Sequence, residues 1–169
     1  MTWKDAYLKQ AFSDYSIYQE FQKPKNRKPV CHQLHYLQMA TEKFSKSQLC
    51  KGNKPPEKKT HFVLVRYLRT IKRLPQIRNM LGFKGKHEAF GYFIDSLIPV
   101  ADMIENLAPA GSGMPKPNPE YPWEDVKTKQ VVSPLDYEFM NLSDSITVMA
   151  KFKALFDTLM HRHGYKNLY

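Results

Sequence analysis

Apolar residues recur at steps of three and four along most of this chain, and this spacing limits what it can fold into. Such steps place side chains on one face of an α-helix, whereas a strand with one buried face needs strict alternation. The spacing predicts helices at about 3–22, 30–51, 61–74, 86–107 and 134–163. We therefore predict an all-α fold, an antiparallel helical bundle of five or six helices that forms a single domain over residues 1–169.

Capping residues and prolines predict where these helices begin and end. Thr2 and Thr60 are suited to N-cap the first and third helices. Ser133 followed by Pro134 predicts the start of the last helix, and Gly164 predicts its end. A break of that helix near 141–143 is an alternative. Pro99 falls inside the fourth predicted helix and is expected to kink or split it, because its nitrogen cannot donate a hydrogen bond.

The longest irregular segment is predicted at 108–132, which contains five prolines. A loop of this length is usually functional or disordered. Tyr121 and Trp123 favour an ordered loop that is docked on the bundle. One interpretation of the function follows from this loop and the acidic segment 88–125, which together would dock a partner protein and make the chain a non-catalytic interaction module.

Charge is distributed unevenly along the sequence. The net charge is +10, but residues 1–87 carry +14 and residues 88–125 carry −6. Such a balance favours polyanionic partners without specifying a fold. The acidic segment is interpreted as a solvated face, or as a partner for the basic half within one chain or across a dimer.

The strongest candidate for binding is the stretch 61–87, with seven basic and no acidic side chains. Arginine guanidinium groups suit phosphate oxygens, and Tyr67 is a candidate stacking surface for a base. A purely solvated helix face is the competing interpretation. The candidate nucleic-acid or nucleotide ligands are Arg66, Arg69, Lys72, Arg73 and Arg78.

The sequence predicts no metal and no cofactor. Cys31, His32 and His35 have a spacing that resembles a metal motif, but no second cluster supplies the remaining ligands. Cys31 and Cys50 bracket one predicted helix and are too far apart for a disulfide, which favours a reducing, cytoplasmic setting. No run of about 18 apolar residues predicts a membrane span.

Residues 31–46 resemble the HEPN superfamily, the higher eukaryotes and prokaryotes nucleotide-binding domain. Members often carry a helix that reads Gln-x-x-x-Glu-Lys-x-x-Lys, here Gln38, Glu42, Lys43 and Lys46. A loop and then a histidine that heads a leucine-spaced helix follow, here at His61. The resemblance covers about 30–75, under a third of the chain, and the predicted bundle is compatible with that family.

The resemblance implies a two-fold homodimer and a role in a bacterial toxin–antitoxin, defence or related system. It also implies that RNA or a nucleotide is bound. Active members are metal-independent endoribonucleases whose signature is Arg, four to six residues, then His. In some toxin members a partner nucleotidyltransferase modifies a tyrosine that ends the motif.

The catalytic candidates implied by this resemblance are His163, Tyr165, Arg27 and His32. His163 and Tyr165 keep the His-x-Tyr ending, but the positions upstream of His163 that should hold an arginine do not. Arg27 and His32 have the required spacing, at a predicted junction of loop and helix. Whether the chain is an enzyme is uncertain at this stage, and an endoribonuclease is the alternative to a purely binding protein.

A second set of polar residues follows one stripe of the helix at 30–51. His35, Gln38, Glu42 and Lys46 recur at steps of three and four. They are interpreted as a polar ladder at a dimer interface or in a small ligand cleft, or else as ordinary pairs on an exposed face.

Overall fold

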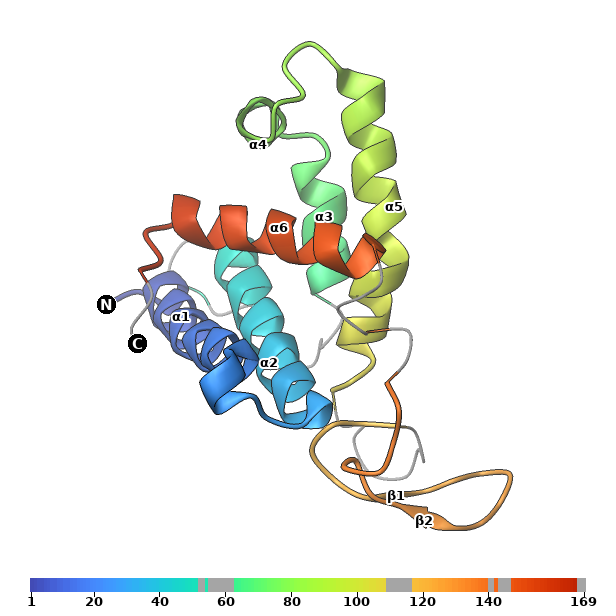
Figure 1. Cartoon of the computed structure of the whole chain (residues 1–169). Coiled ribbons are helices and arrows are strands. Elements are labelled where there is room, and N and C mark those ends of the chain that lie inside the picture. Colours follow the sequence, from blue (N-terminus) through green and yellow to red (C-terminus); the bar gives the residue numbers. More distant parts are fainter. Residues whose placement is uncertain (52–53, 55–62, 109–116, 140–141, 143–146, 167–169) are drawn as a thin grey trace.

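The computed structural model describes residues 1–51, 54, 63–108, 117–139, 142 and 147–166, and its fold is an all-α bundle as predicted (Figure 1). The described residues form six α-helices, one 3₁₀ turn and one two-stranded sheet. The helices are α1 (Trp3–Gln22), α2 (Val30–Leu49), α3 (Leu64–Ile71), α4 (Pro75–Met80), α5 (His87–Glu105) and α6 (Thr147–Arg162). None of these helices is both long and apolar enough to cross a membrane.

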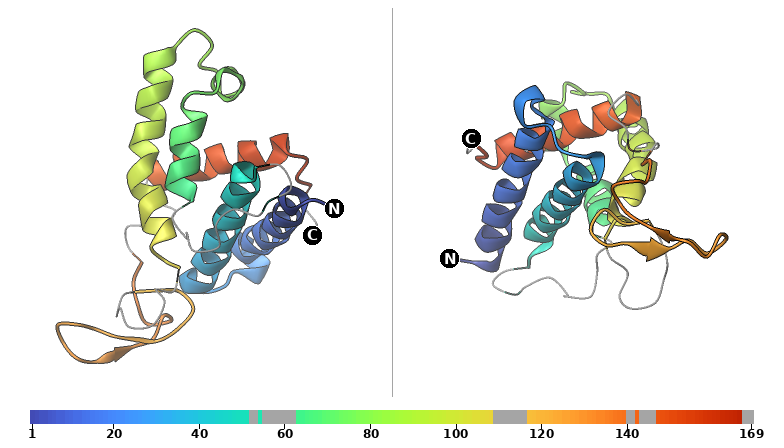
Figure 2. Two further views of the ribbon diagram at one scale, coloured as in Figure 1. Left: turned by 180° about the vertical axis from the view of Figure 1, so that it is seen from behind. Right: turned by 60° about the horizontal axis from the view of Figure 1, so that its bottom comes forward.

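Helices α1 and α2 lie side by side and antiparallel (Figures 1 and 2). Thr2 caps α1 as predicted: its Oγ1 accepts a hydrogen bond of 3.2 Å from the backbone nitrogen of Asp5, and the Asp5 carboxylate accepts one from the nitrogen of Thr2. A 3₁₀ turn, η1 (Pro24–Asn26), joins the helices, because the two prolines of this basic stretch stop helical continuation. Both predicted ranges agree with the structure to within two residues.

Helices α3 and α5 pack against each other and form the other half of the bundle (Figure 1). Pro99 lies inside α5, which continues as one helix from His87 to Glu105. Of the two predicted outcomes, a kink or a split, the split therefore does not occur. The range predicted for α3 was 61–74, of which 61–62 and the expected cap Thr60 lie outside the described residues. The short helix α4 was not predicted, because six residues are too few to establish a period.

Helix α6 crosses the end of α2 and packs on α5 (Figure 1). Phe156 on α6 meets Phe44 on α2 and Tyr15 on α1 in edge-to-face contacts, with ring centroids 5.4 and 5.2 Å apart. Phe44 and Phe156 are fully buried, so these rings form the centre of the core. Gly164 ends the helix as predicted, with a positive φ of 88° that suits glycine.

The predicted start of the last helix at Ser133 is wrong. Ser133 and Pro134 form a turn instead, in which the backbone nitrogen of Asp136 donates to the carbonyl of Ser133 at 3.1 Å. The Ser133 hydroxyl accepts from the nitrogen of Leu135, as an N-cap would, but residues 137–139 are not helical, and α6 extends from Thr147 to Arg162. Most of the predicted break at 141–143 lies outside the described residues.

The proline-rich segment forms a projecting hairpin. Strands β1 (Trp123–Glu124) and β2 (Val131–Val132) pair antiparallel and extend away from the helices, at the same end as the α1–α2 turn (Figures 1 and 2). Trp123 is buried and meets the ring of Tyr137 edge-on at 5.1 Å. Tyr137 belongs to the segment that follows β2, so this contact orders the loop, and docking of Trp123 on the helices stays a prediction. Tyr121 is 55% exposed, and the corresponding expectation for it is wrong.

Candidate nucleic-acid interface

Helix α3 has one buried face and one basic face. Leu64, Tyr67, Leu68 and Ile71 are buried, and they recur at steps of three and four against α2 and α5. The opposite face carries the exposed side chains of Arg66 and Arg69, and Arg73 follows just beyond the end of the helix. The same spacing that builds the core therefore gathers the arginines on the solvent side.

Three of the five predicted ligands have uncompensated charge. Arg66, Arg69 and Arg73 are exposed, and none of their guanidinium groups forms a hydrogen bond or an ion pair with another described residue. From Arg66 to Arg73 the helical rise is roughly 10 Å, which is about the length of three base-pair steps of a nucleic acid. We call the surface formed by these three side chains the basic face.

Lys72 is paired within the chain. Its Nζ lies 2.6 Å from Oδ2 of Asp95 on α5, and its side chain lies across Gly91, one turn earlier on α5. A Cβ at Gly91 would lie 3.2 Å from Cε of Lys72, so the glycine leaves the space in which the lysine rests. The charge of Lys72 is therefore largely balanced, and its contribution to the basic face is smaller than the sequence suggested.

Arg78 is also partly engaged. Its Nη1 contacts Nδ1 of His87 at the start of α5, and its Nε is buried without a hydrogen-bond partner among the described residues. This contact ties α4 to α5 behind the basic face. Lys84 and Lys86 in the intervening turn are exposed. They extend the positive charge beyond the arginines that the sequence singled out.

Tyr67 cannot offer a stacking surface, contrary to expectation. Its ring is only 4% exposed and meets Phe44 edge-on at 5.6 Å. Burial raises the pKa of its hydroxyl. The helical spacing places Tyr67 on the apolar stripe with Leu64 and Leu68, so it belongs to the core.

The basic helix begins at a buried carboxylate that the sequence did not reveal. Oε1 of Glu105, near the end of α5, accepts hydrogen bonds from the backbone nitrogens of Leu64 and, at 3.0 Å, Val65. These nitrogens have no partner inside the helix, so Glu105 acts as the cap that α3 otherwise lacks. Burial is the main cause that raises the pKa of Glu105 to about 7.

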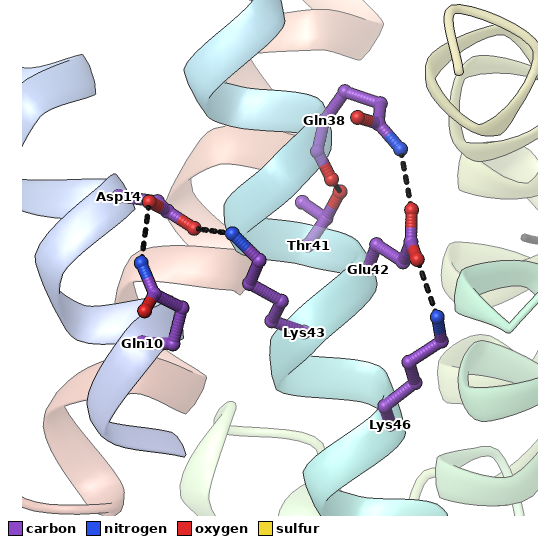
Figure 3. A network of polar contacts seen from close by, with 7 residues as sticks. All are labelled: Gln10, Asp14, Gln38, Thr41, Glu42, Lys43 and Lys46. Carbon is purple, nitrogen blue, oxygen red and sulfur yellow. Dashed lines mark hydrogen bonds and ion pairs between the residues drawn. The ribbon is translucent and has the colours of Figure 1, made fainter. Parts of the chain in front are cut away.

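Three of the four members of the predicted polar ladder are connected (Figure 3). The side-chain nitrogen of Gln38 donates to Glu42 at 2.8 Å, and Nζ of Lys46 donates to the same carboxylate at 2.5 Å. Gln38 and Lys46 are buried within this one chain. The ladder is therefore an internal link on the side of α2 that faces α3 and α5, rather than an open exposed face.

His35 does not belong to this ladder. Its Nδ1 lies 3.9 Å from the carboxylate of Glu120, in the proline-rich segment, and burial lowers its pKa. On the α1 side of α2, Nζ of Lys43 instead lies 2.6 Å from the buried carboxylate of Asp14 (Figure 3). This pair links α1 to α2 and was not predicted, because nothing in the sequence aligns the two helices.

The catalytic candidates at the end of the chain are turned inward. The hydroxyl of Tyr165 is bonded to Gln19 at 2.8 Å and to Ser16 at 3.1 Å, and its ring is buried. The imidazole of His163 meets the ring of Phe44 edge-on at 5.4 Å, and burial lowers its pKa, as do Lys4 and Arg162. Tyr165 is therefore buried, whereas His163 is half-buried against Phe44.

The other two catalytic candidates lie elsewhere. Arg27 and His32 are exposed at the start of α2. His163 contacts Phe44, which is twelve positions, or roughly 18 Å, further along that helix. The structure therefore does not bring the four candidates together within one chain.

Among the described residues, no group of three or more His, Cys, Asp and Glu side chains is placed to hold a metal ion. Cys31 and Cys50 are free thiols at opposite ends of α2. Burial raises the pKa of both.

In comparisons with known proteins, the chain matches no protein-family model, no curated protein and no solved structure.

Proposed function

We propose that this chain is a HEPN-like protein that binds RNA or a nucleotide through the basic face of α3. Arg66, Arg69 and Arg73 are the primary phosphate ligands, and Arg78 and Lys72 flank them. The observation that supports this is three exposed arginines on one side of α3, with no acidic partner among the described residues. Ordinary exposed helices mix charges of both signs, so a face of one sign favours an anionic partner.

The proposal extends to the setting of the protein. In this proposal the protein is a cytoplasmic homodimer in a bacterial toxin–antitoxin, defence or related system, and a cognate nucleotidyltransferase or another partner protein acts with it. The resemblance of residues 31–46 to HEPN helices supports this, together with an all-α bundle and two free thiols.

The alternative functions have less support from the geometry. Endoribonuclease activity stays a prediction, since the four catalytic candidates lie apart and His163 and Tyr165 face the core. If the chain cleaves RNA, a dimer must bring catalytic side chains from its two chains together at one site. The interaction-module alternative rests on the hairpin that projects from the bundle (Figure 1).

The test measures RNA affinity against salt. Fluorescence anisotropy with a labelled single-stranded RNA is recorded between 50 and 200 mM KCl for the wild type and for Arg66→Gln/Arg69→Gln/Arg73→Gln. For single strands, log K against log salt falls with a slope of about −0.7 per neutralised phosphate. We expect the triple variant to bind more weakly and its slope to shrink by about 2.

The matched control variant also removes three positive charges, but from residues outside the basic face. Lys9→Gln/Lys25→Gln/Lys127→Gln changes three exposed lysines that lie outside the basic face. We expect this variant to retain most of the affinity and slope. Equal loss in both variants would mean that only net charge matters, and unchanged binding in the arginine variant would refute the proposal. The mass from light scattering tests the homodimer separately.

A further inference from the structure

A pocket of about 670 Å³ lies between the start of α2 and the segment that follows β2. This volume is within the usual range for small-molecule sites. Leu34 on α2 and Leu135 and Phe139 on the opposite wall supply apolar surface. The described residues that line the pocket come from α1, the α1–α2 connection, α2 and the segment after β2, and none of them belongs to α3 or α4.

Among the described residues that line this pocket, two carry charged side chains. Arg27 comes from the α1–α2 connection and Glu138 from the opposite wall. Neither forms a hydrogen bond or an ion pair with another described residue, and they do not pair with each other. The pocket therefore has one available cation and one available anion, at separate places on an apolar lining.

The two glutamines that line the pocket are already engaged. The side-chain nitrogen of Gln22 donates to Tyr18 at 3.0 Å, and its oxygen accepts from Nζ of Lys153 at 3.0 Å. Gln33 donates to the carbonyl of Lys28 at 2.7 Å. A ligand therefore meets fixed amides on this wall, and Arg27 remains the strongest donor available to it.

The positive side of the pocket is reinforced by the backbone. Pro29 is the N-cap of α2, no side chain caps this end, and the first turn has no acidic residue. Pro29 and Val30 both line the pocket. The partial positive charge of a helix start adds to that of Arg27, and both favour a negative group on the α2 side.

We propose that this pocket binds a small apolar carboxylic acid. The carboxylate lies against Arg27 and the first turn of α2, and the hydrocarbon part lies between Leu34, Leu135 and Phe139. Glu138 stands on the other wall and repels the carboxylate, which sets the orientation of the ligand. This site does not depend on the proposed nucleic-acid interface, because Arg27 lies outside the basic face.

The first test compares three probes that share a ten-carbon chain. Decanoate, decan-1-ol and decylammonium are titrated by calorimetry, each below the concentration at which it aggregates. We expect decanoate to bind at one per chain and more tightly than decan-1-ol, and decylammonium to bind most weakly. Equal affinity for all three would overturn the proposal, as would the absence of saturable decanoate binding.

Charge variants of the pocket give shifts of opposite sign. Arg27→Gln is expected to weaken decanoate binding about tenfold, because a charge-assisted hydrogen bond is lost. Glu138→Gln is expected to tighten it about threefold, because a repulsive charge is removed. Lys9→Gln, which removes a lysine on α1 that does not line the pocket, is the control for net charge. An Arg27→Gln variant that binds like the wild type contradicts the assignment.

The last test uses a pair of variants at Val30, which lines the pocket at the start of α2. Val30 is 46% exposed and is the first residue of α2. A carboxylate is favourable at this position, so Val30→Glu should fold, as circular dichroism will verify, yet repel decanoate. Val30→Gln has the same shape as Val30→Glu without its charge and should bind decanoate more tightly than Val30→Glu. Equal binding by both variants would place the ligand elsewhere.

Discussion

The carboxylate of Glu105, near the end of α5, accepts a hydrogen bond of 3.0 Å from the backbone nitrogen of Val65, in the first turn of α3. The same oxygen accepts a second hydrogen bond from Leu64. Burial raises the pKa of Glu105 to about 7 despite these two donors, and Glu42 acts in the same direction. The helix that carries the basic face is thus held by a carboxyl group that titrates near neutral pH.

This raised pKa predicts that stability depends on pH. Between the ordinary value of 4.5 and about 7, the folded protein keeps a proton on Glu105 that the unfolded chain releases. The contribution of Glu105 to the free energy of unfolding is therefore largest below pH 4.5 and is lost as the pH rises through 7. The slope is at most about 1.4 kcal/mol per pH unit, and urea unfolding at several pH values measures it.

Glu105→Gln isolates this effect from other titrating groups. The amide oxygen still accepts from Leu64 and Val65 but carries no charge. We expect the difference in unfolding free energy between the two proteins to change from pH 4.5 to 7 and to favour the variant at the higher end. A difference that is constant over this range would show that Glu105 has an ordinary pKa.

Gly91→Ala is expected to stabilise the protein by about 0.5–1 kcal/mol. Gly91 is in the interior of α5, where alanine is the better helix former. The added Cβ would meet only the flexible end of the Lys72 side chain, which can shift. Thermal and urea unfolding measure the change. A loss of stability would mean that Lys72 is held more firmly than its exposure suggests.

Asp95→Asn is expected to strengthen RNA binding. It releases Lys72, whose Nζ lies 2.6 Å from Oδ2 of Asp95, and so adds one available cation beside the basic face. Because both side chains are substantially exposed, stability should change by less than about 1 kcal/mol. The salt slope should become steeper by about 0.7.

The comparison for Asp95→Asn is Asp136→Asn, which removes an exposed carboxylate in the turn after β2. This change alters net charge equally but leaves Lys72 paired. Anisotropy titrations should place it close to the wild type. If both variants tighten binding to the same degree, the effect is one of overall charge.

Tyr165→Phe is expected to destabilise the fold by about 1–2 kcal/mol. The hydroxyl bonds to Ser16 and Gln19, and its removal leaves the fully buried Ser16 without this partner. Tyr121→Phe, at an exposed position, should have little effect. Denaturant midpoints measure both variants. A lower midpoint for Tyr165→Phe alone would show that the Tyr165 hydroxyl stabilises the fold, whereas equal midpoints would contradict this role.

The long helices could be predicted because their buried residues recur at the spacing of an α-helix. α1 and α2 each run for 20 residues, so the apolar stripe repeats often enough to define both ends. Thr2 also gives the capping signal that the structure contains. The helices α3 and α4 are shorter, with eight and six residues, and their limits depend on contacts with α5.

The error at Ser133 has a local cause. A serine hydroxyl that accepts from a backbone nitrogen two residues later stabilises a single turn as well as a helix start. The Ser-Pro pattern that predicted a helix start is therefore explained by a single turn. The exposed Leu135 is consistent with this, since no buried stripe follows from it.

The candidate site was only partly predictable. The positions of Arg66, Arg69 and Arg73 on one face follow from helical spacing alone. The pairing of Lys72 with Asp95 and the capping by Glu105 could not be predicted, because both join residues 23 to 41 positions apart in the sequence. Such contacts depend on how α3 and α5 align, and no local pattern encodes this.

The contacts between the first and last helices have a consequence for the order of folding. Tyr15 and Gln19 on α1 bond to Asp157 on α6 across 142 and 138 residues, whereas α1 and α2 meet through a short turn. Local pairings form early because little chain entropy is lost in closing the loop. The α1–α2 hairpin can therefore assemble while the chain is still being synthesised. The aromatic centre around Phe44 needs Phe156 on α6, so this centre can close only after α6 has been synthesised.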